Sequence, residues 1–571
     1  MNNRDLYIGF NALSHHSSAA IVEGGGEVLG AVEEERFSHL KREGRWPIES
    51  IRYCLRAAGA ATTDLAGVAF GWSPGSFFVD RIVRSQLFEY PVASSIVGKS
   101  FRRLWSMAHQ RDEFQRRVGY LCSACRFLNI RHHMAHAASA YFSSPFDCSA
   151  FITWDGRGEA DAMTWGMAYA SRIRQFGAVR FPNSIGKLYS AMCRYLGFAG
   201  AEKDGTVMAL AACGEARFRR EFGKLFRWDF SGAAPWVQLG TSYFDLADVA
   251  LPSAEMAKLF DLPSRRADEP LLDVHRDIAA TLQLVTQTFM VDFASFVRRR
   301  TRSERLVMAG GVALNTVANG LIAERCGYRD LFIQPAAHDG GLALGTALYL
   351  AAMGRREKSR WTMRSAAIGP QYDERAIERA IHGVESVVVT RPPCVAKAAA
   401  SRMARGEIIG WFQGRLEFGP RALGHRSLLA DPRIATIKGE LNKLKQREPF
   451  RPFGISILAE HAPKWLKHGK PSPHMLIVDH FKENLRHQFP SALHVDGSVR
   501  VQTVVITDEP EFHQLISSFA AQTGVPIVIN TSLNEKGKPL ACTPADAMAY
   551  FLGARGLHSL YIGPFEVVKR E

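Results

Sequence analysis

Short apolar runs alternate with polar or glycine-rich turns along much of the chain. Four of the runs have the length of buried strands: 6–10, 150–154, 306–309 and 331–334. The turns that follow them are Asn11 with a His/Ser loop, Asp155-Gly-Arg-Gly-Glu159, Gly310–Asn315 and His338–Gly345. Helical periodicity starts directly after the last two turns, which favours an α/β fold. Ligands of open α/β folds bind outside the carboxyl ends of strands, so we expect these turns to share one cleft.

A histidine pair stands at helical spacing in the segment His132-His-Met-Ala-His136. Residues four apart lie on one face of a helix, so the rings of His132 and His136 can share a metal ion. Asp155 and Asp339, each after a predicted strand, are acidic residues that can complete the site. Such ligands suit Fe(II), Mn(II) or Zn(II), and the zincin pattern is excluded because no glutamate follows the first histidine. The alternative is a helix face with two hydrogen-bonded histidines; His133 keeps a structural interpretation.

Two glycine pairs follow predicted strands, Gly310-Gly311 and Gly340-Gly341. Glycines in such turns let backbone N–H groups approach phosphate closely, and a helix N-terminus favours the negative charge. The candidate nucleotide-binding residues of this half of the chain are Gly156, Gly158, Gly310, Gly311 and Asn315. A plain tight turn between strand and helix explains each glycine pair equally well when it is taken alone.

The chain has 571 residues, which favours two or three domains over a single core. With 47% apolar and 22% charged residues it is typical of globular proteins and not of disordered ones. The excess of 71 Lys and Arg over 56 Asp and Glu favours anionic partners such as nucleotides, nucleic acid, phosphorylated substrates or an acidic membrane surface. A basic solvated surface is the alternative.

Nine cysteines with a single CxxC pair, Cys122 and Cys125, favour a reduced cytosolic protein over a disulfide framework. The N-terminus lacks the apolar core of a signal peptide. No apolar run approaches the ~20 residues of a membrane span. We therefore expect a cytoplasmic protein without a membrane partner.

A shift to charged residues near 354–361, after a long apolar helix, indicates a domain boundary. We predict a first domain over 1–353, a linker over 354–366 and a second domain over 367–571. Residues 80–118 form a separate basic helical stretch, which is either a solvated insertion or a wall of the acceptor site.

The second domain is rich in cations beside glycine turns. The segment Gly414–Arg426 is followed by Lys443, Lys445, Arg447 and Arg451, with apolar residues interleaved that favour a packed loop over a free basic exterior. Arginine forks hold phosphate oxygens in bidentate fashion, so the pattern indicates a polyphosphate pocket. The apolar run 525–529 delivers Asn530 and Ser532 either to the edge of that pocket or to a plain strand-end turn.

Taken together, these motifs resemble those of the O-carbamoyltransferase family, which includes the nodulation carbamoyltransferases and the enzyme that carbamoylates tobramycin in antibiotic tailoring. The resemblance covers nearly the whole chain. Its motifs, in chain order, are Val32–Phe37, His132–His136, Asp155–Glu159, Gly310–Asn315, Asp339–Gly345, Gly419–Ser427, Lys445–Pro452, His494–Arg500 and Asn530–Ser532.

The resemblance implies an α/β chain of two domains. The first is expected to be an actin/hexokinase-like ATPase domain, similar to that of the tRNA threonylcarbamoyladenosine transferases. The second is expected to be an α/β domain similar to threonylcarbamoyl-adenylate synthases (YrdC-like). In such enzymes the second domain makes carbamoyladenylate from carbamoyl phosphate and ATP, the latter with Mg²⁺. The first then transfers the carbamoyl group to a hydroxyl of a small-molecule acceptor, and no nucleic acid is expected.

The same resemblance implies roles for individual residues. An iron-type metal would be held by His132, His136, Asp155 and Asp339. The phosphate and nucleotide binders of the second domain would be Arg421, Lys445, Arg447, Arg451, Arg500, Asn530 and Ser532. Among them we expect Lys445, Arg500 and Arg421 to be catalytic, together with His15 of the N-terminal loop.

Two positions depart from the family pattern. The N-terminal loop of the family reads His-Asp, whereas here His15 is followed by His16. The loop therefore lacks the carboxylate that would take part in base chemistry toward the acceptor. The family often has a lysine just before the Val-Met segment, where this chain has Thr206 and a lysine three residues earlier, Lys203.

Two other functions stay open beside an O-carbamoyltransferase. A threonylcarbamoyl-type transferase acting on tRNA fits the basic charge, but the order of domains and the lack of a visible RNA-binding module disfavour it. A non-catalytic nucleotide-binding protein would need the phosphate binders without an intact metal set. The identity of the acceptor cannot be read from the sequence.

Overall fold

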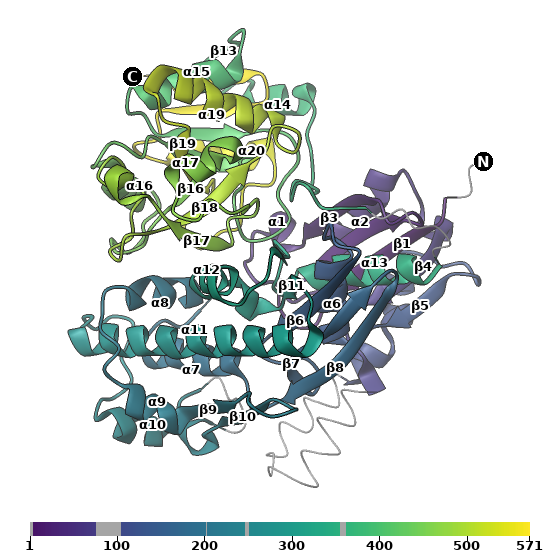
Figure 1. Cartoon of the computed structure of the whole chain (residues 1–571). Coiled ribbons are helices and arrows are strands. Elements are labelled where there is room, and N and C mark those ends of the chain that lie inside the picture. The colour runs from purple at the N-terminus through teal and green to yellow at the C-terminus, as the bar shows by residue number, and fades with distance from the viewer. Residues whose placement is uncertain (1–3, 76–103, 201–202, 246–250, 355–360, 571) are drawn as a thin grey trace. The chain divides into compact units, whose positions relative to one another are not determined.

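The computed structural model describes residues 4–75, 104–200, 203–245, 251–354 and 361–570 (Figure 1). The chain divides into two compact units, Met1–Glu34 with Arg42–Met363 and Glu35–Lys41 with Arg364–Glu571. The break after Met363 falls inside the stretch predicted as a linker, and no sequence pattern indicated that Glu35–Lys41 belongs with the second unit. Residues 80–103 of the predicted basic stretch and 355–360 of the predicted linker lie outside the described residues.

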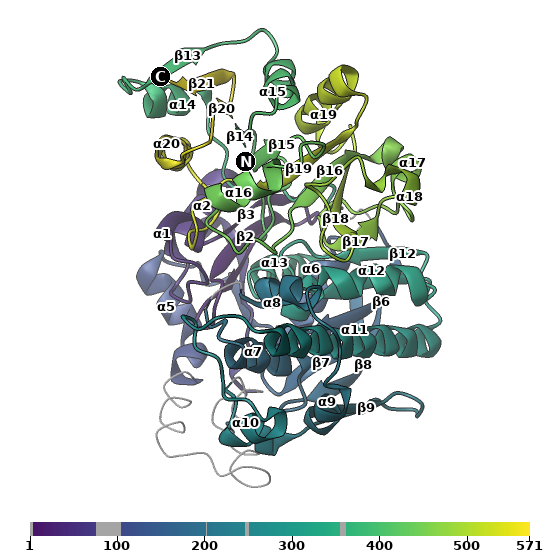
Figure 2. The same cartoon turned by 90° about the vertical axis from the view of Figure 1, so that its left-hand side faces the viewer.

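The first unit contains two five-stranded sheets with the same strand order (Figure 1, Figure 2). One has the order β3-β2-β1-β4-β5 and the other β8-β7-β6-β11-β12. In each, the first three strands of the sequence pair antiparallel, and the last two join the first in parallel. The strands are β1 (Leu6–Asn11), β2 (Ser18–Glu23), β3 (Val28–Glu33), β4 (Leu65–Phe70), β5 (Arg126–Asn129), β6 (Cys148–Trp154), β7 (Asp161–Tyr169), β8 (Arg172–Arg180), β11 (Arg305–Ala309) and β12 (Asp330–Ile333).

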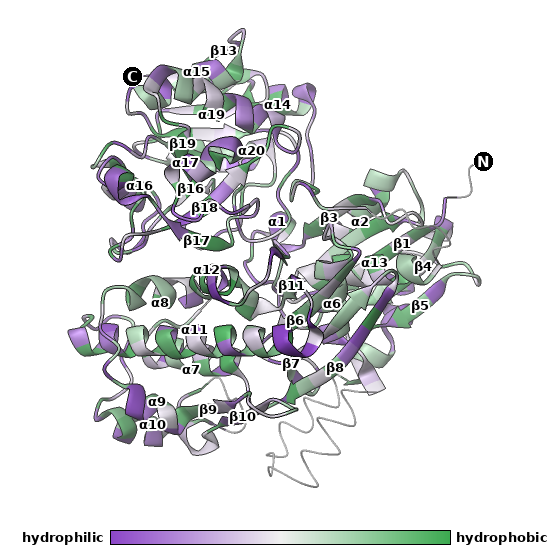
Figure 3. Cartoon of the chain, viewed as in Figure 1, coloured by the Kyte–Doolittle hydropathy of each residue, from purple (hydrophilic) through white to green (hydrophobic). Residues whose placement is uncertain are grey.

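The predicted α/β fold class is confirmed, and the repeat of one strand order is an addition to it. Parallel strands need long crossover connections, which here are helices. The edge strand β8 is largely hydrophilic, as Figure 3 shows, and exposed arginines along β8 protect its unpaired edge from other strands.

Two helices lie between the sheets. Helix α6 (His132–Tyr141) packs on β6 and β11, α13 (Gly341–Gly354) packs on β1 and β2, and the two helices contact each other. Helix α13 is buried and apolar on almost every side because sheet and helix cover it from opposite directions.

The outer faces of the first unit carry most of its remaining helices. Helix α2 (Ile48–Ala58) packs on β2 and β3, and α11 (Asp273–Thr301) packs on β6 and β7. The other described elements are α5 (Gln110–Arg117), α7 (Ile185–Tyr195), α8 (Lys203–Ala211), α9 (Arg219–Leu225), β9 (Phe226–Asp229), β10 (Trp236–Leu239), α10 (Ala254–Phe260) and α12 (Thr316–Arg325).

The second unit is built on a nine-stranded mixed sheet of order β13-β21-β20-β14-β15-β19-β16-β18-β17. Its strands are β13 (Val387–Thr390), β14 (Ile409–Phe412), β15 (Arg426–Ala430), β16 (Gly454–Leu458), β17 (Ile477–His480), β18 (Ser498–Val504), β19 (Ile527–Ser532), β20 (Ser559–Ile562) and β21 (Phe565–Lys569). This architecture is compatible with the predicted α/β second domain.

Helices cover both faces of this sheet. Helices α15 (Val395–Ala404) and α19 (Pro510–Thr523) pack together over one apolar cluster, while α14 (Glu374–Ile381) and α20 (Pro544–Gly553) cover another. Shorter helices are α1 (Glu35–Ser38), α16 (Ile437–Leu444), α17 (Ala462–Trp465) and α18 (Glu483–Arg486).

All nine cysteines of the chain are free. Among the described residues, no helix combines the length and the apolar character that crossing a membrane requires.

Candidate active site

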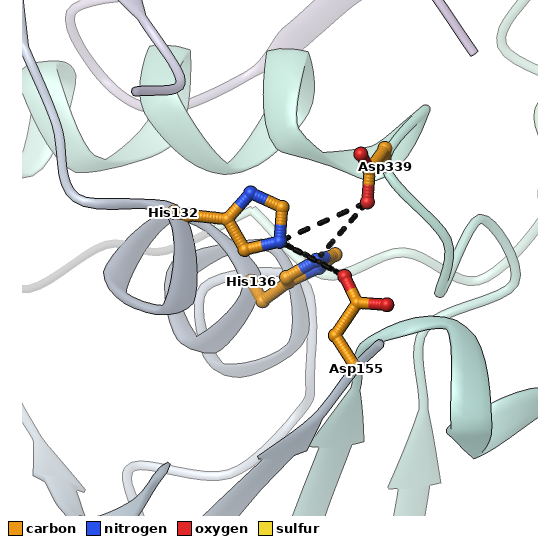
Figure 4. Close-up of side chains that lie close together, drawn as sticks. All are labelled: His132, His136, Asp155 and Asp339. Atoms are coloured by element: carbon orange, nitrogen blue, oxygen red, sulfur yellow. Dashed lines mark hydrogen bonds and ion pairs between the residues drawn. The ribbon is translucent and has the colours of Figure 1, made fainter. Parts of the chain in front are cut away.

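The histidine pair lies on the first turns of α6, as its spacing predicted. His132 and His136 are completely buried, and their Nε2 atoms are 3.1 Å apart. Their Nδ1 atoms make no hydrogen bond within the part of the chain that the structure describes. Both rings therefore direct their Nε2 atoms toward a common point (Figure 4).

Two aspartates complete this cluster. Asp155 directly follows β6, and its Oδ2 is 2.9 Å from His132 Nε2 and 3.4 Å from His136 Nε2. Asp339 precedes α13, and its Oδ1 is 3.8 Å and 3.7 Å from the same two atoms. One ligand atom from each of the four residues lies within 4.8 Å of every other (Figure 4). The four residues predicted as metal ligands thus come together.

The carboxylates hold negative charge in this buried cluster. Burial raises the pKa of Asp155, but hydrogen bonds and charge from His132 and His136 outweigh it and hold that pKa well below its usual range. The pKa of Asp339 is also lowered, because the charge of nearby histidines, His15 first, outweighs burial. Burial lowers the pKa of His136, yet the two carboxylates outweigh it and raise that pKa to about 9. The cluster therefore attracts positive charge.

The donor set fits a divalent metal. Nitrogen and carboxylate ligands about 2.1 Å from one ion lie roughly 3.0–3.4 Å apart at right to tetrahedral angles. The distances within the histidine pair and from His136 to Asp155 match this range, and that from His132 to Asp155 is 0.1 Å shorter. Asp339 lies a few tenths of an ångström farther out, and its buried Oδ1 has no hydrogen-bond partner among the described residues. Two imidazoles with two carboxylates suit Fe(II), Mn(II) or Zn(II).

His133 has a different role from its neighbours. Its Nε2 donates to the carbonyl of Asp161 at 2.9 Å, so its Nδ1 accepts from the Thr153 hydroxyl at 2.8 Å. Burial and the neighbouring His132 and His136 lower the pKa of His133 to about 3. His133 is therefore a neutral, hydrogen-bonded link between α6 and the β6–β7 turn.

The N-terminal loop borders this cluster. His15 Nδ1 lies 3.4 Å from Asp339 Oδ2, and the ring is 44% exposed. Its Nδ1 is also 2.9 Å from Nδ1 of His16, whose ring stacks on His338 at 4.1 Å. His16 stands where the family has a carboxylate, so at this position an imidazole pair replaces the expected His-Asp pair.

The predicted glycine turns converge on Asp155. Gly156 N–H donates to Asp155 Oδ1 at 2.6 Å, and a Cβ built on Gly311 would lie 3.4 Å from the same oxygen. Gly310 has a φ of 93°, and a methyl group there would overlap the carbonyl of Trp154. Gly158 is equally confined by the His133 ring. These glycines let the loops pack closely around the aspartate.

Asn315 is occupied by structural contacts. Its Oδ1 accepts from Ala318 N–H at 3.1 Å and so caps α12, and its amide exchanges hydrogen bonds with Gln283. The nucleotide-binding role predicted for Asn315 and the glycines stays a prediction.

In the second unit, three predicted phosphate binders gather around a fourth, Arg500. Arg421, Arg447 and Arg451 act electrostatically on Arg500, and together with its burial they lower the pKa of Arg500 well below its usual range. Arginine keeps its proton in proteins, so this crowding of like charge favours a bound anion. The Nε of Arg500 makes no hydrogen bond among the described residues.

Arg500 lies beside a glycine of the neighbouring strand. Arg500 of β18 and Asn530 of β19 both lie beside Gly454 of β16, on the same face. A Cβ at Gly454 would come within 3.3 Å of Arg500 Nε. The same Cβ would overlap Sδ of Met475, so the glycine allows both side chains to pack beside the strand. Asn530 Nδ2 donates to Ser456 and to Gln502 in a buried network.

Lys445 is tied to the end of β19. Its Nζ donates to the carbonyl of Ser532 at 2.7 Å, to Asn534 Oδ1 at 2.5 Å and to the Asn534 carbonyl. The side chain is buried, and these contacts use the three donors of an ammonium group. The structure thus shows that Lys445 anchors the end of β19 through hydrogen bonds. Its catalytic role stays a prediction.

Sequence reasoning missed two carboxylates that shape these sites. Glu417 Oε1 accepts the N–H groups of Leu423, His425 and Arg426 and so folds the loop that contains Arg421. Glu159 accepts the N–H of His132 at the start of α6. Each stands inside a motif that was recognised, but only its spatial neighbours reveal its role.

Comparison with known proteins identifies the family. Residues 7–348 match the model described as carbamoyltransferase N-terminus, and residues 400–569 match that described as carbamoyltransferase C-terminus. An uncharacterized protein of Synechocystis sp. is 33% identical over 95% of this chain and 94% of its own length. Nodulation protein NolNO of Sinorhizobium fredii is 31% identical over 97% of this chain and 79% of its own length.

More distant likenesses are partial. The 3'-hydroxymethylcephem-O-carbamoyltransferase of Amycolatopsis lactamdurans is 33% identical over 49% of this chain and 52% of its own length. Full-length HypF in its phosphate- and nucleotide-bound form is 12% identical, covering 62% of this chain and 56% of that chain with a TM-score of 0.32. The ROK hexokinase of Thermus thermophilus is 14% identical, covering 60% of this chain and 98% of that chain with a TM-score of 0.28. Such scores support no conclusion about function.

The two family models span both units, and two relatives align over nearly the whole chain. The chain therefore belongs to the carbamoyltransferase family and is an enzyme of that family.

Proposed function

We propose that this enzyme is an ATP-dependent O-carbamoyltransferase that makes carbamoyladenylate and passes its carbamoyl group to a hydroxyl of a small-molecule acceptor. The observation that carries the proposal is the opposite charge of two centres, one in each unit. The first unit holds one buried and one mostly buried carboxylate with two histidines, and the second holds four clustered arginines. A cation belongs in the first centre and a polyphosphate in the second.

In the adenylation step, water releases phosphate from carbamoyl phosphate, and the resulting carbamate attacks the α-phosphorus of ATP. A C–O–P linkage forms and pyrophosphate leaves. The arginine cluster around Arg500 would offset the negative charge of the phosphates, with Mg²⁺ accompanying ATP. We assign this step to the second unit because Arg421, Arg447 and Arg451 crowd Arg500 there.

In the transfer step, the acceptor oxygen bonds to the carbamoyl carbon, and AMP leaves with the electrons of the anhydride bond. Activation as an adenylate is needed because nitrogen donates into the carbamoyl carbonyl and makes it a poor electrophile. A divalent metal such as Fe(II), held by His132, His136, Asp155 and Asp339, would supply Lewis-acid polarisation of that carbonyl. To His15, exposed beside Asp339, we assign acceptance of the hydroxyl proton.

A small hydroxylated acceptor is supported by the family. The Amycolatopsis relative is named for the hydroxymethyl group of a cephem, a small natural product. An acceptor of the natural-product or sugar type follows for this chain as part of the proposal.

The test follows pyrophosphate release with ATP and carbamoyl phosphate in the absence of an acceptor. The parent enzyme should release pyrophosphate, and Arg500→Gln should slow release by about 10²–10³-fold, the typical effect of removing one charge-stabilising donor. The matched control is Arg391→Gln in the same unit, because Arg391 is exposed and paired with Glu374. It should stay close to the parent.

His136→Gln separates the two steps. This variant should keep pyrophosphate release and lose carbamoyl transfer, because His136 belongs to the histidine–aspartate centre of the first unit and not to the arginine cluster of the second. An equal loss of both steps in a folded variant would contradict the division of labour. A parent that releases no pyrophosphate would refute the adenylation step, and a salt-sensitive complex with tRNA would favour the threonylcarbamoyl alternative.

A further inference from the structure

We propose that Glu159 is a positioning residue of the metal centre. Its carboxylate fastens the first turn of α6 to the turn that carries Asp155, and so sets the separation of His132 from Asp155. This inference rests on the proposed metal centre and adds a residue outside its four ligands.

Helix α6 begins without a side-chain cap of its own. The residue before it, Arg131, makes no capping hydrogen bond, and the first N–H groups of a helix have no partner within the helix. Glu159 supplies the missing acceptor: its Oε1 and Oε2 lie 3.0 Å and 3.2 Å from His132 N. A carboxylate at this end is also favoured by the helix dipole.

The same carboxylate reaches a third segment. Glu159 Oε1 accepts the N–H of Ser73 at 2.9 Å, and the adjacent Trp72 places its ring 4.4 Å from the ring of His132. Glu159 is only 5% exposed, so these bonds form away from water. One carboxylate thereby joins the start of α6, the segment after β4 and the β6–β7 turn.

The β6–β7 turn transmits the position of Glu159 to Asp155. Asp155 N–H bonds to the carbonyl of Ala162 at 2.9 Å, and Gly158 N–H bonds to that of Asp161 at 2.8 Å. The turn is therefore closed by its own backbone between the two acidic residues. The ring of His133 also ties α6 to this turn, but among the described residues Glu159 is the acceptor for the backbone N–H of His132, so its loss should loosen the 2.9 Å contact between His132 and Asp155.

Glu34 provides a matched control in the same unit. Its carboxylate also caps a helix from a distant segment, accepting Glu49 N–H at 3.1 Å, Ser50 N–H at 2.8 Å and the Ser50 hydroxyl at 2.6 Å at the start of α2. Glu34 is 7% exposed, close to the value of Glu159. Helix α2 carries no candidate metal ligand, so the two carboxylates differ in what their helices support.

The experiment titrates Co(II) into the full-length chain and records affinity by calorimetry and the visible absorption of the bound ion. Glu159→Gln should weaken Co(II) binding about 10–100-fold and change the absorption spectrum, as loss of residues that orient metal ligands does. Glu34→Gln should lower the melting temperature to a similar extent and leave affinity and spectrum unchanged. If Glu159→Gln does not fold, Glu159→Asp keeps the charge, withdraws it by one methylene and should weaken binding.

Parent-like affinity and spectrum in a folded Glu159 variant would overturn the inference. So would equal weakening in Glu34→Gln, which would mean that general destabilisation explains the loss. A parent chain that binds no Co(II) would overturn the metal centre itself, and with it the transfer step of the proposed function. The outcomes therefore distinguish a wrong assignment of Glu159 from a wrong assignment of the metal centre.

Discussion

Gly345 of α13 packs so closely on Ala135 of α6 that a methyl group at position 345 would overlap the carbonyl oxygen of Ala135. The same methyl group would lie 2.9 Å from Ser139 N. His136 directly follows Ala135, and Asp339 stands just before α13. The contact between the two helix backbones therefore helps set the distance between a histidine and an aspartate of the candidate metal centre.

Gly345→Ala should force α6 and α13 apart. Overpacking at a contact between backbones typically lowers the free energy of unfolding by about 1–3 kcal/mol. Metal affinity should fall as well, because Asp339 moves away from the histidine pair. Urea unfolding and metal titration measure the two effects. Gly223→Ala in α9 is the control, since a Cβ there meets nothing within 4 Å and should stabilise the protein or leave it unchanged.

A divalent metal should stabilise the enzyme through the four-residue centre. Free metal at 100 times its dissociation constant raises the free energy of unfolding by about 2.7 kcal/mol when it binds only the folded chain. His136→Gln should abolish this gain, and a chelator should reverse it in the parent. Urea unfolding with and without metal measures the effect. His487→Gln, at an exposed histidine, should respond like the parent; an equal gain in His136→Gln would locate the metal elsewhere.

Arg451→Gln should stabilise the chain without ligand. Arg451 is one of the guanidinium groups crowded around Arg500, and its ion pair with Glu448 is long at 3.8 Å, so its removal should relieve net repulsion by about 0.5–1 kcal/mol. Pyrophosphate should raise the melting temperature of the parent but less that of the variant. Arg433→Gln should instead destabilise, because Arg433 forms a 2.6 Å ion pair with buried Asp431. A destabilised Arg451→Gln would show that the arginines are not under repulsion.

Stability should fall with rising pH through the pair of His425 and Glu509, which are 2.7 Å apart. Burial lowers the pKa of His425, but the charge and hydrogen bond of Glu509 outweigh it, so the pKa in the folded chain lies above its ordinary value. The pair's contribution is complete below about pH 6.5, the unfolded value, and is lost as pH rises through the folded pKa. Urea unfolding over a pH series should show this loss.

Two variants test that assignment. His425→Gln and Glu509→Gln should each remove the same pH-dependent part of the unfolding free energy, because either change breaks the pair. A parent-like pH dependence in both variants would assign the titration to another group.

The sequence predicted the four candidate metal ligands of the first unit because the patterns that indicate them are local. The spacing of His132 and His136 fixes one helix face, and Asp155 and Asp339 stand where strands end. The engagement of Lys445 with Asn534 had no such signal, since the two residues are 89 positions apart and meet only in the folded sheet. The capping of α6 by Glu159 is likewise invisible in a helix sequence that has no capping residue of its own.

For the fold, too, local features of the sequence were predictable and long-range pairing was not. Strand ends and helical periodicity indicated α/β layers, but neither revealed that two sheets repeat one strand order. The repeat lies in which strands pair and in what register, and the identities of the side chains do not reveal it. The segment Glu35–Lys41 was missed for a related reason: contacts alone assign it to the second unit, and its composition does not differ from its surroundings.

The repeated sheets have a mechanical consequence. Asp155 follows β6 and Asp339 follows β12 of the same sheet, but Asp339 also stands just before α13, which packs on the strands of the other sheet. An ion bound by both aspartates would join the end of β6 to the start of the helix that packs on the other sheet. A shift of α13 away from β6 would lengthen the bonds to that ion, so the rate of metal release should report how often α13 shifts.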